Sequence, residues 1–428
     1  MGAPGLLTAS GDYWKYHRKL LDPTIQNTKI LNSYYPTINS TLRILVDILN
    51  EKSPKETFDI FPRIDACSFD LFAKSTLGVD CNVQREHCSF FESLNELSKL
   101  YPMAKRATGD MRAVVQDIIR KRMVTLASSD QSHREEDEYE KRLRIFVDEA
   151  IQLTTEQKCF TEDELITESL TILMTGFETS AVSITNTVLM LAMHPQYQEM
   201  VYQEIEKICP NIDEDVTSEQ LKELVFTEQC IKESMRLIPT VPLTSRLATE
   251  DFYIGETYVP AGCEIVLSSY ELHRNKNVWG NDANTYNPDR FLPERFEKQH
   301  PYSYLPYSAG KKYAQIVIRM FIVWLVRNFK FTTDLKLEEL SLKWMVVLKT
   351  NQGYPVRIEK RLAVGLPLGF WMGPQFMIMI TSPEDTEIVI NHPNSMHKGA
   401  FYEVAIEGMG APGLLTASGI YLTFDFLV

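Results

Sequence analysis

The stretch YLPYSAGKKYAQIVIRMFIVWLVRNF, Tyr304 to Phe329, joins a short turn to a long apolar helix. Pro306, Ser308 and Gly310 are turn-forming residues, and Tyr313 to Phe329 has the length and apolar content of a core helix. Because glycine has no Cβ, a turn of this composition brings the backbone close to a flat ligand. The stretch therefore predicts a ligand-facing turn that is held in place by a buried helix.

A second long apolar helix is predicted from Glu164 to Met193, and it contains the polar interruption TGFETS at Thr175 to Ser180. Glycine and threonine weaken a helix, and a threonine hydroxyl that bonds a carbonyl one turn earlier can bend it. Such a bend makes room for water or a ligand. The alternative is an ordinary helix that packs closely at Gly176 and leaves Glu178 in solvent.

Three further motifs carry charged side chains at helical spacing. KESMRLIP places Glu233 and Arg236 on one helix face, and YNPDRFLPERF contains Arg290. Near the N-terminus, WKYHR places Trp14 and Arg18 one helical turn apart. Taken singly, the first pair is compatible with a surface ion pair, and the last with an arginine beside a half-buried indole.

Together these motifs resemble the cytochrome P-450 family of haem-thiolate monooxygenases. Their wording (PDRFLPERF, LPYSAG, ESMRLIP) looks like the animal microsomal subgroup that includes fatty-acid ω-hydroxylases. The resemblance covers Gly11 to about Arg361 in order. It implies a mainly α fold with small β regions, here incomplete or rearranged, and haem as the cofactor between a helical and a β-rich domain.

The resemblance also assigns residues to the haem site. It implies that Glu178 and Thr179 relay protons during oxygen activation, beside the close approach that Gly176 allows. It places Tyr307 and Gly310 in the loop that carries the iron ligand.

Charged residues receive two roles from the same resemblance. The donors to the haem propionates would be Trp14, Arg18 and Arg246. A buried structural network, which fixes the segment ahead of the turn, would consist of Glu233, Arg236 and Arg290.

One part of the family pattern is missing. Tyr307 to Gly310 match the first half of the family's ligand loop, and Lys312 to Ala314 match the start of its next helix, but the ligating cysteine between them is absent. Tyrosine ligates haem iron in catalase, so Tyr307 or Tyr313 is a possible replacement. We expect neither to act as one, because such a site also needs a fixed shell of supporting groups.

No other metal site is predicted. The seven cysteines have no zinc-type spacing, and the odd number in a long chain favours a reduced, cytosol-facing compartment. Three histidines have no partners at ligand spacing and are interpreted as structural: His17, His194 and His273.

Composition narrows the class of protein. The 428 residues are 44% hydrophobic and 24% charged, which is ordinary for a globular protein. The net charge of −13 argues against a nucleic-acid partner, which needs clustered Lys and Arg. No charged-then-apolar leader and no run of 18 apolar residues occur, so we expect no transmembrane anchor in this chain. The resemblance nevertheless implies the cytosolic face of the endoplasmic reticulum membrane, an NADPH-dependent reductase partner, a lipophilic substrate and a monomer.

The two ends of the chain share the segment MGAPGLLTASG, which occupies Met1 to Gly11 and recurs at Met409 to Gly419. Leu362 to Gly408 reads as two strands around Gly373-Pro374, followed by a helix opened at Ser382, and it resembles the region that lies upstream of WKYHR in the family. We therefore predict a P-450-like domain at 1–361 that lacks its N-terminal part, and a 362–428 segment from the N-terminal region of a second copy. A tandem-gene fusion or a faulty gene model explains this order, and a circularly permuted fold is the alternative.

The remaining pattern is mainly helical. Predicted helices are Trp14 to Leu21 (ending at Pro23), Thr28 to Asn50, Phe61 to Leu77, Gln196 to Ile208 and Leu221 to Leu237. Ser128 to Glu140 is predicted to be a solvated loop, Phe252 to Leu267 a set of short strands, and Leu342 to Ile358 a hairpin turning at Asn351 to Gly353.

Two functions follow. The first is a haem monooxygenase that uses O2 and NADPH-derived electrons to hydroxylate a lipophilic substrate, inactive as written without its cysteine. The second is a non-catalytic pseudoenzyme or degenerate product that at most binds a hydrophobic ligand.

Overall fold

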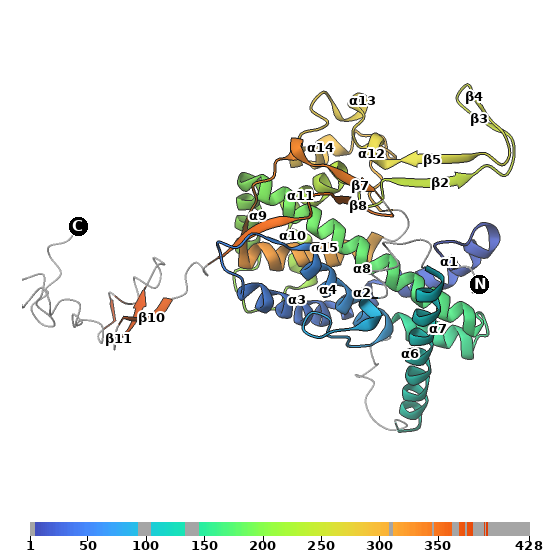
Figure 1. Cartoon of the computed structure of the whole chain (residues 1–428), viewed down its shortest axis with the longest axis horizontal. Helices are drawn as coiled ribbons and strands as arrows, with labels where there is room; N and C mark the ends of the chain where they lie inside the picture. Colours follow the sequence, from blue (N-terminus) through green and yellow to red (C-terminus); the bar gives the residue numbers. More distant parts are fainter. Residues whose placement is uncertain are drawn as a thin grey trace, which may run out of the picture. The chain divides into compact units, whose positions relative to one another are not determined.

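The computed structural model describes residues 5–92, 104–132, 145–307, 311–344, 346–361, 368–372, 375–379, 389 and 391–392. The chain divides into two compact units, Met1–Arg361 and Leu362–Val428. The first unit is mainly helical with small sheets, as predicted (Figure 1).

The longer helices of the first unit are α1 (Gly11–Gln26), α3 (Tyr35–Asn50), α4 (Phe61–Phe72), α6 (Ala104–Ser132), α7 (Phe146–Thr155), α8 (Glu162–Met193), α9 (Pro195–Ile208), α11 (Val225–Leu237) and α15 (Lys311–Asn328). The shorter helices are α2 (Thr28–Ser33), α10 (Ser218–Glu223), α12 (Ser269–Leu272), α13 (Lys276–Trp279) and α14 (Pro293–Phe296), with single turns at η1 (Ala73–Leu77), η2 (Pro288–Phe291) and η3 (Leu337–Glu339).

The core is organised around α8, which packs against α4, α11 and α15. Thr161 caps its first turn, because its hydroxyl accepts from Glu164 N at 3.2 Å while the Glu164 carboxylate accepts from Thr161 N at 2.8 Å. Every residue from Ser180 to Ala192 is buried, which is typical of a helix surrounded by others. The helix ends before His194-Pro195, as predicted.

Small antiparallel sheets flank the helices. β9 (Pro355–Lys360) pairs with β1 (Phe58–Asp59) and β6 (Phe329–Thr332), and β7 (Leu342–Trp344) pairs with β8 (Leu348–Thr350). The predicted hairpin at Asn351 to Gly353 is therefore wrong. Gly353 has a φ of 69°, and the turn there sends the chain from the β7–β8 pair into the other sheet.

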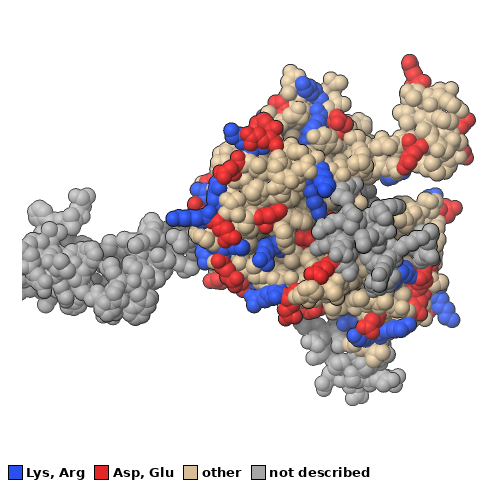
Figure 2. All heavy atoms as spheres, in the orientation of Figure 1, with Lys and Arg blue, Asp and Glu red and all other residues tan. Residues whose placement is uncertain are grey.

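A two-tier ribbon extends from the helical body in Figure 1. β2 (Leu243–Leu247) pairs with β5 (Glu264–Ser268), and between them β3 (Phe252–Ile254) pairs with β4 (Thr257–Val259), as the short-strand pattern predicts. Large apolar side chains on it are exposed, among them Leu247 at 65% and Tyr253 at 68%. In Figure 2 this lobe is accordingly mostly tan, whereas charges of both signs alternate over the visible face of the body.

Three predicted helix boundaries are wrong. α1 continues through Pro23 to Gln26, because proline fixes its own φ at a helical value and can be accommodated inside a helix with a lost hydrogen bond. The predicted Thr28 to Asn50 helix is two helices, because Pro36 has no N–H and belongs to the first turn of a new one. The predicted Leu221 to Leu237 helix is interrupted at Leu224.

The interruption at Leu224 has a visible cause in a neighbouring helix. The Glu204 carboxylate of α9 accepts from Phe226 N and Thr227 N, both at 2.8 Å, and thereby caps α11 as a separate helix. The predicted loop at Ser128 to Glu140 is also partly wrong, since α6 is helical to Ser132; 133–144 lie outside the described residues.

In the second unit, β10 (Leu368–Met372) and β11 (Gln375–Met379) form an antiparallel pair with Met372 opposite Gln375. This is the strand pair that the sequence predicts on either side of Gly373-Pro374. The helix predicted from Ser382 and the repeated segment at Met409 lie outside the described residues.

Candidate functional site

The polar interruption of α8 leaves the helix continuous. The Thr175 hydroxyl donates to Thr171 O at 2.7 Å, and the Thr179 hydroxyl donates to Thr175 O at 2.5 Å. Both hydroxyls are thus engaged one turn back along their own helix, as the sequence allowed. Thr179, the predicted proton-relay residue, has its hydroxyl hydrogen directed to the backbone.

Gly176 faces an aromatic side chain. A Cβ at this position would lie 2.2 Å from Phe72 Cε1. The Phe72 ring contacts the ring of Tyr313, with centroids 5.0 Å apart, and the Tyr313 hydroxyl hydrogen-bonds Ser75 Oγ at 2.5 Å. The close approach expected at Gly176 is therefore made by α4, whose Phe72 was not predicted to take part.

Glu178, the other predicted catalytic residue, forms an ion pair. Its Oε1 lies 2.8 Å from Lys349 Nζ of β8, and the same ammonium group lies 4.3 Å from the centroid of the Phe61 ring. The carboxylate is therefore held against the strand rather than left in solvent. The spacing of residues in the sequence gave no signal for Lys349, because it is 171 residues away.

The predicted propionate donors lie on α1 and β2. Trp14 is half-buried on α1, and Arg18 Nε pairs with Asp22 Oδ1 at 2.6 Å within the same helix. Arg246 is exposed on β2 and donates to Ser245 O at 2.7 Å. Each arginine therefore already has an acceptor within the protein.

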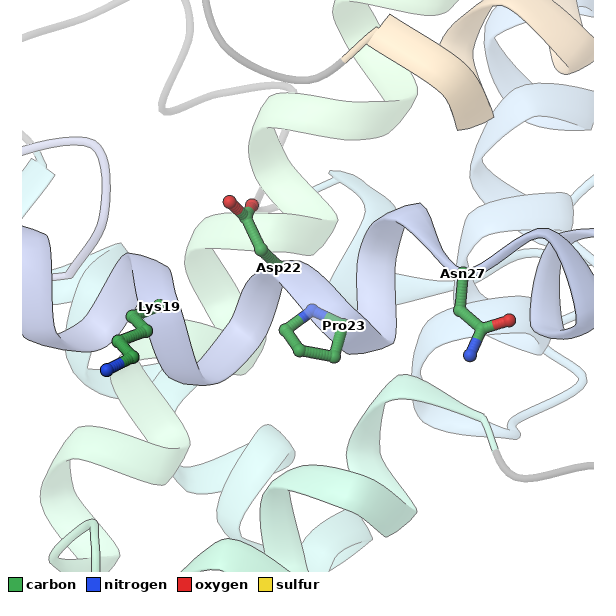
Figure 3. Close-up of a pocket in the computed structure, with 4 residues that line it drawn as sticks. All are labelled: Lys19, Asp22, Pro23 and Asn27. Atoms are coloured by element: carbon green, nitrogen blue, oxygen red, sulfur yellow. The ribbon is translucent and has the colours of Figure 1, made fainter.

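An open cleft of about 490 Å³ runs along α1 and is lined by Lys19, Asp22, Pro23 and Asn27 (Figure 3). In this view the Asp22 carboxylate points to the opposite side of α1 from Asn27. The cleft combines a cation, a carboxylate already paired with Arg18 and an amide, and this set does not single out one ligand.

His17 is at the centre of a cluster between α1 and α8. It is 1% exposed; its Nδ1 lies 2.9 Å from Glu168 Oε1 and its Nε2 lies 3.5 Å from Glu164 Oε1. Tyr13 donates to Glu164 at 2.8 Å. Burial alone would raise the pKa of Glu164, but hydrogen bonds from Thr161 and Tyr13 hold it below its usual value. The histidine is thus fully engaged, in line with its structural interpretation, and Glu164 and Glu168 at i, i+4 spacing were the available sign of this cluster.

The structure brings Glu233, Arg236 and Arg290 together. Arg236 makes a two-bond contact with Glu233 at 2.7 and 2.8 Å, and both side chains have 0% exposure. Arg290 Nε lies 3.5 Å from the same carboxylate. Burial raises the pKa of Glu233, although the two guanidinium groups act in the opposite direction.

The network also fixes the chain that leads to the turn. Arg236 donates to the carbonyls of His273 and Ala283, each at 2.7 Å, and His273 Nε2 accepts from Leu305 N at 2.9 Å. Tyr304 donates to Lys232 O at 2.9 Å. Of the two predicted turn residues, Tyr307 is packed against the core and Gly310 lies outside the described residues.

The described residues do not fit a thiolate-ligated haem. No cysteine follows Cys263 in the sequence, and that residue comes directly before β5 rather than ahead of α15. Burial raises the pKa values of the Cys67 and Cys230 thiols, which keeps them protonated. Burial likewise raises the pKa of Tyr313, so a phenolate ligand is disfavoured there.

Comparisons with known proteins agree on the family. The cytochrome P450 family model matches residues 2–357. Probable cytochrome P450 313a4 of Drosophila melanogaster is 28% identical over 389 residues, covering 83% of this chain and 77% of that protein. Cytochrome P450 4V2 of Mus musculus is 27% identical over 389 residues, covering 83% and 74%.

A solved structure extends the comparison to the fold. The crystal structure of a cytochrome P450, CYP102L1, has a TM-score of 0.73 at 20% sequence identity, covering 83% of this chain and 81% of that one. No helix in the described part of the chain is long and apolar enough to cross a membrane. The match over residues 2–357 shows that the chain belongs to the cytochrome P450 family, whose cofactor is haem.

Proposed function

We propose that this chain keeps the scaffold of a monooxygenase for lipophilic substrates, such as a fatty acid, steroid or xenobiotic, but does not itself insert oxygen. One observation carries this proposal. The segment from Tyr307 into α15 reads YSAGKKYAQ and contains no cysteine, so the chain has no thiolate at the position where the family pattern requires one.

The surroundings of the predicted catalytic residues support the proposal. A proton relay needs groups that can exchange hydrogen bonds with water near the reacting atoms. Here Glu178 is paired with Lys349 at 2.8 Å, and Thr179 donates to its own helix at 2.5 Å. The chain therefore keeps the residue types of a proton relay, but both side chains already bond to groups of the protein.

The family resemblance extends the proposal to location and partners. Members of the family receive electrons from a redox partner. For this chain we propose a monomer at the cytosolic face of the endoplasmic reticulum membrane that has no productive exchange with an NADPH-dependent reductase. Fractionation of cells that express the chain tests the location, and recovery in a compartment other than microsomes would contradict it.

A pair of insertion variants tests the loss of activity. One variant receives a basic-x-Cys-x-Gly segment between Gly310 and Lys311, and its control receives the same segment with serine in place of cysteine. Each protein is supplied with haem, reductase, NADPH and a fatty acid, and hydroxylated product is measured. We expect product only from the cysteine variant. Reductase-dependent product from the unaltered chain would overturn the proposal.

A further inference from the structure

A second cleft lies where the end of α11 meets the segment that leads into β7. Its volume is about 470 Å³, and its apolar wall is formed by Leu237, Ile238, Leu340 and Leu342. Small-molecule sites in proteins commonly enclose about 300–1,000 Å³ and have mostly apolar walls with few polar groups. In size this cleft is therefore suited to a small organic ligand. Its lining is mixed, because polar side chains also line it, namely His194, Arg274, Asn284, Thr285 and Glu338.

One half-buried cation, Arg274, lines the same cleft. The Arg274 guanidinium stacks on the Tyr270 ring, with its Cζ 3.7 Å from the ring centroid. It donates to the carbonyl of Leu237 and, at 3.4 Å, to that of Tyr270. An arginine carries five N–H donors, so these contacts leave some unused.

No carboxylate forms an ion pair with Arg274 in the part of the chain that the structure describes, and Glu271 and Glu233 act on it only from beyond ion-pair contact. Burial, and then repulsion from Arg236, lower the pKa of Arg274, and Tyr270, Glu271 and Glu233 offset this only in part. Since arginine remains protonated in proteins, the effect measures how poorly this charge is compensated. An anion at this position would relieve that cost.

The other polar groups of the cleft leave Arg274 dominant. Glu338 lies on the rim and is exposed, so solvent screens its charge. Burial lowers the pKa of His194, whose ring is therefore neutral near pH 7 and stacks on Tyr286 with centroids 4.6 Å apart. The cleft thus has one cation, two aromatic walls and an aliphatic wall.

We propose that this cleft binds a small amphiphile, with its carboxylate on Arg274 and its hydrocarbon body along Leu237, Ile238, Leu340 and Leu342. A carboxylate matches a single planar guanidinium, because its two oxygens accept from two parallel N–H donors. The site is separate from the polar turn of α8 and from the segment ahead of α15. Its occupation therefore does not depend on haem or on the proposed loss of activity.

Calorimetric titration of the full chain with decanoate and with decanol tests the proposal. The two ligands have the same hydrocarbon body and differ in the charge of the head group. We expect saturable binding of decanoate at one site and at least about tenfold weaker binding of decanol, because decanol lacks the charge-assisted contact with the guanidinium. Equal affinity for the two ligands would overturn the proposal.

Two variants locate the site. Arg274→Gln removes the cation, and Asn284→Trp fills the cleft from an exposed position that lines it. Both are expected to lose decanoate binding, while Arg295→Gln on exposed α14 removes the same charge elsewhere and keeps it. Because Arg274 also caps α11, circular dichroism is used to check that the Arg274→Gln variant folds. If that variant is unstable, Asn284→Trp still tests the site. Unchanged binding by folded Arg274→Gln or by Asn284→Trp would place the ligand elsewhere and refute the assignment.

Discussion

Two polar regions of the first unit differ in the partners that their side chains bond. At the end of α11, Glu233 pairs with both Arg236 and Arg290, and the two arginines donate to the carbonyls around them. In the middle of α8, Thr175, Thr179 and Glu178 are also bonded, but to their own helix and to Lys349. The first region works as a self-sufficient structural network. In the second region, two hydroxyls bond one turn back along their own helix and one carboxylate bonds a lysine from a remote strand.

The largest expected effect comes from breaking the self-sufficient network. Arg236→Ala leaves the fully buried Glu233 carboxylate without its main partner, which typically costs about 3–5 kcal/mol. Urea unfolding measures the change against Arg295→Ala, an exposed control expected to change stability by no more than about 0.5 kcal/mol. A loss of less than about 1 kcal/mol for Arg236→Ala would mean that the network does not hold this region.

The same network should respond to pH through His273. Burial, and then the Arg236 charge, lower the pKa of His273 to about 4 from its ordinary value of 6.5. Below pH 6.5 the folded state therefore binds fewer protons at His273 than the unfolded state does. The contribution of His273 to the free energy of unfolding is fully present above pH 6.5 and is lost as the pH falls toward 4. The loss from this group amounts to about 2–3 kcal/mol.

Urea unfolding between pH 7 and pH 4 measures this loss. His273→Gln keeps an acceptor for Leu305 N but does not titrate, so its stability should fall by less over the same range. If the unaltered protein and His273→Gln lose equal stability over this range, His273 is not the group that causes the loss.

The first test of the α8 region adds a methyl group at Gly176, where the Phe72 ring lies close to the helix. Gly176→Ala gains helix propensity of about 0.5–1 kcal/mol but drives a methyl group into the Phe72 ring, and overpacking costs about 1–3 kcal/mol. We expect a net loss of about 1 kcal/mol in thermal unfolding. Adding Phe72→Leu should recover part of this loss, so that the two changes together cost less than the sum of their separate effects. A double variant whose loss equals that sum would argue against the contact.

The smallest expected effect is that of the Glu178–Lys349 pair. Both side chains are partly exposed, so solvent screening limits their coupling to about 1 kcal/mol. A double-mutant cycle with Glu178→Gln and Lys349→Met measures it directly. A coupling indistinguishable from zero would show that Glu178 is free for another partner, and would bring the α8 region closer to an open groove.

The sequence predicted the fold because its long helices have clear signals at both ends. α8 has a capping threonine at Thr161 and His194-Pro195 at its end. The two ends of α15 differ from the predicted ends by no more than two residues. Where boundaries were wrong, the deciding contact came from elsewhere in the chain. Glu204 of α9 starts α11, and β1 pairs with β9 from almost 300 residues away.

For the candidate site, the sequence singled out residues but did not show which partners they contact. The motif with Glu233 and Arg236 at i, i+3 predicts a paired charge, and that pair is local. Lys349 and Phe72 are remote in sequence from the residues they contact, so no spacing rule could place them. The i, i+4 spacing of Glu164 and Glu168 was visible, but not that His17 is their partner. The missing cysteine, in contrast, is a plain reading of the sequence.

The most direct test of the central claim is the absorption spectrum of the full, haem-supplemented chain after reduction and addition of CO. Thiolate ligation pushes electron density onto the iron and shifts the Soret band of the CO complex strongly to the red. The account predicts that this band is absent from the unaltered chain and appears in the variant with a cysteine-containing segment between Gly310 and Lys311. A thiolate-type band from the unaltered chain would contradict the account, because it would show that one of its cysteines reaches the iron.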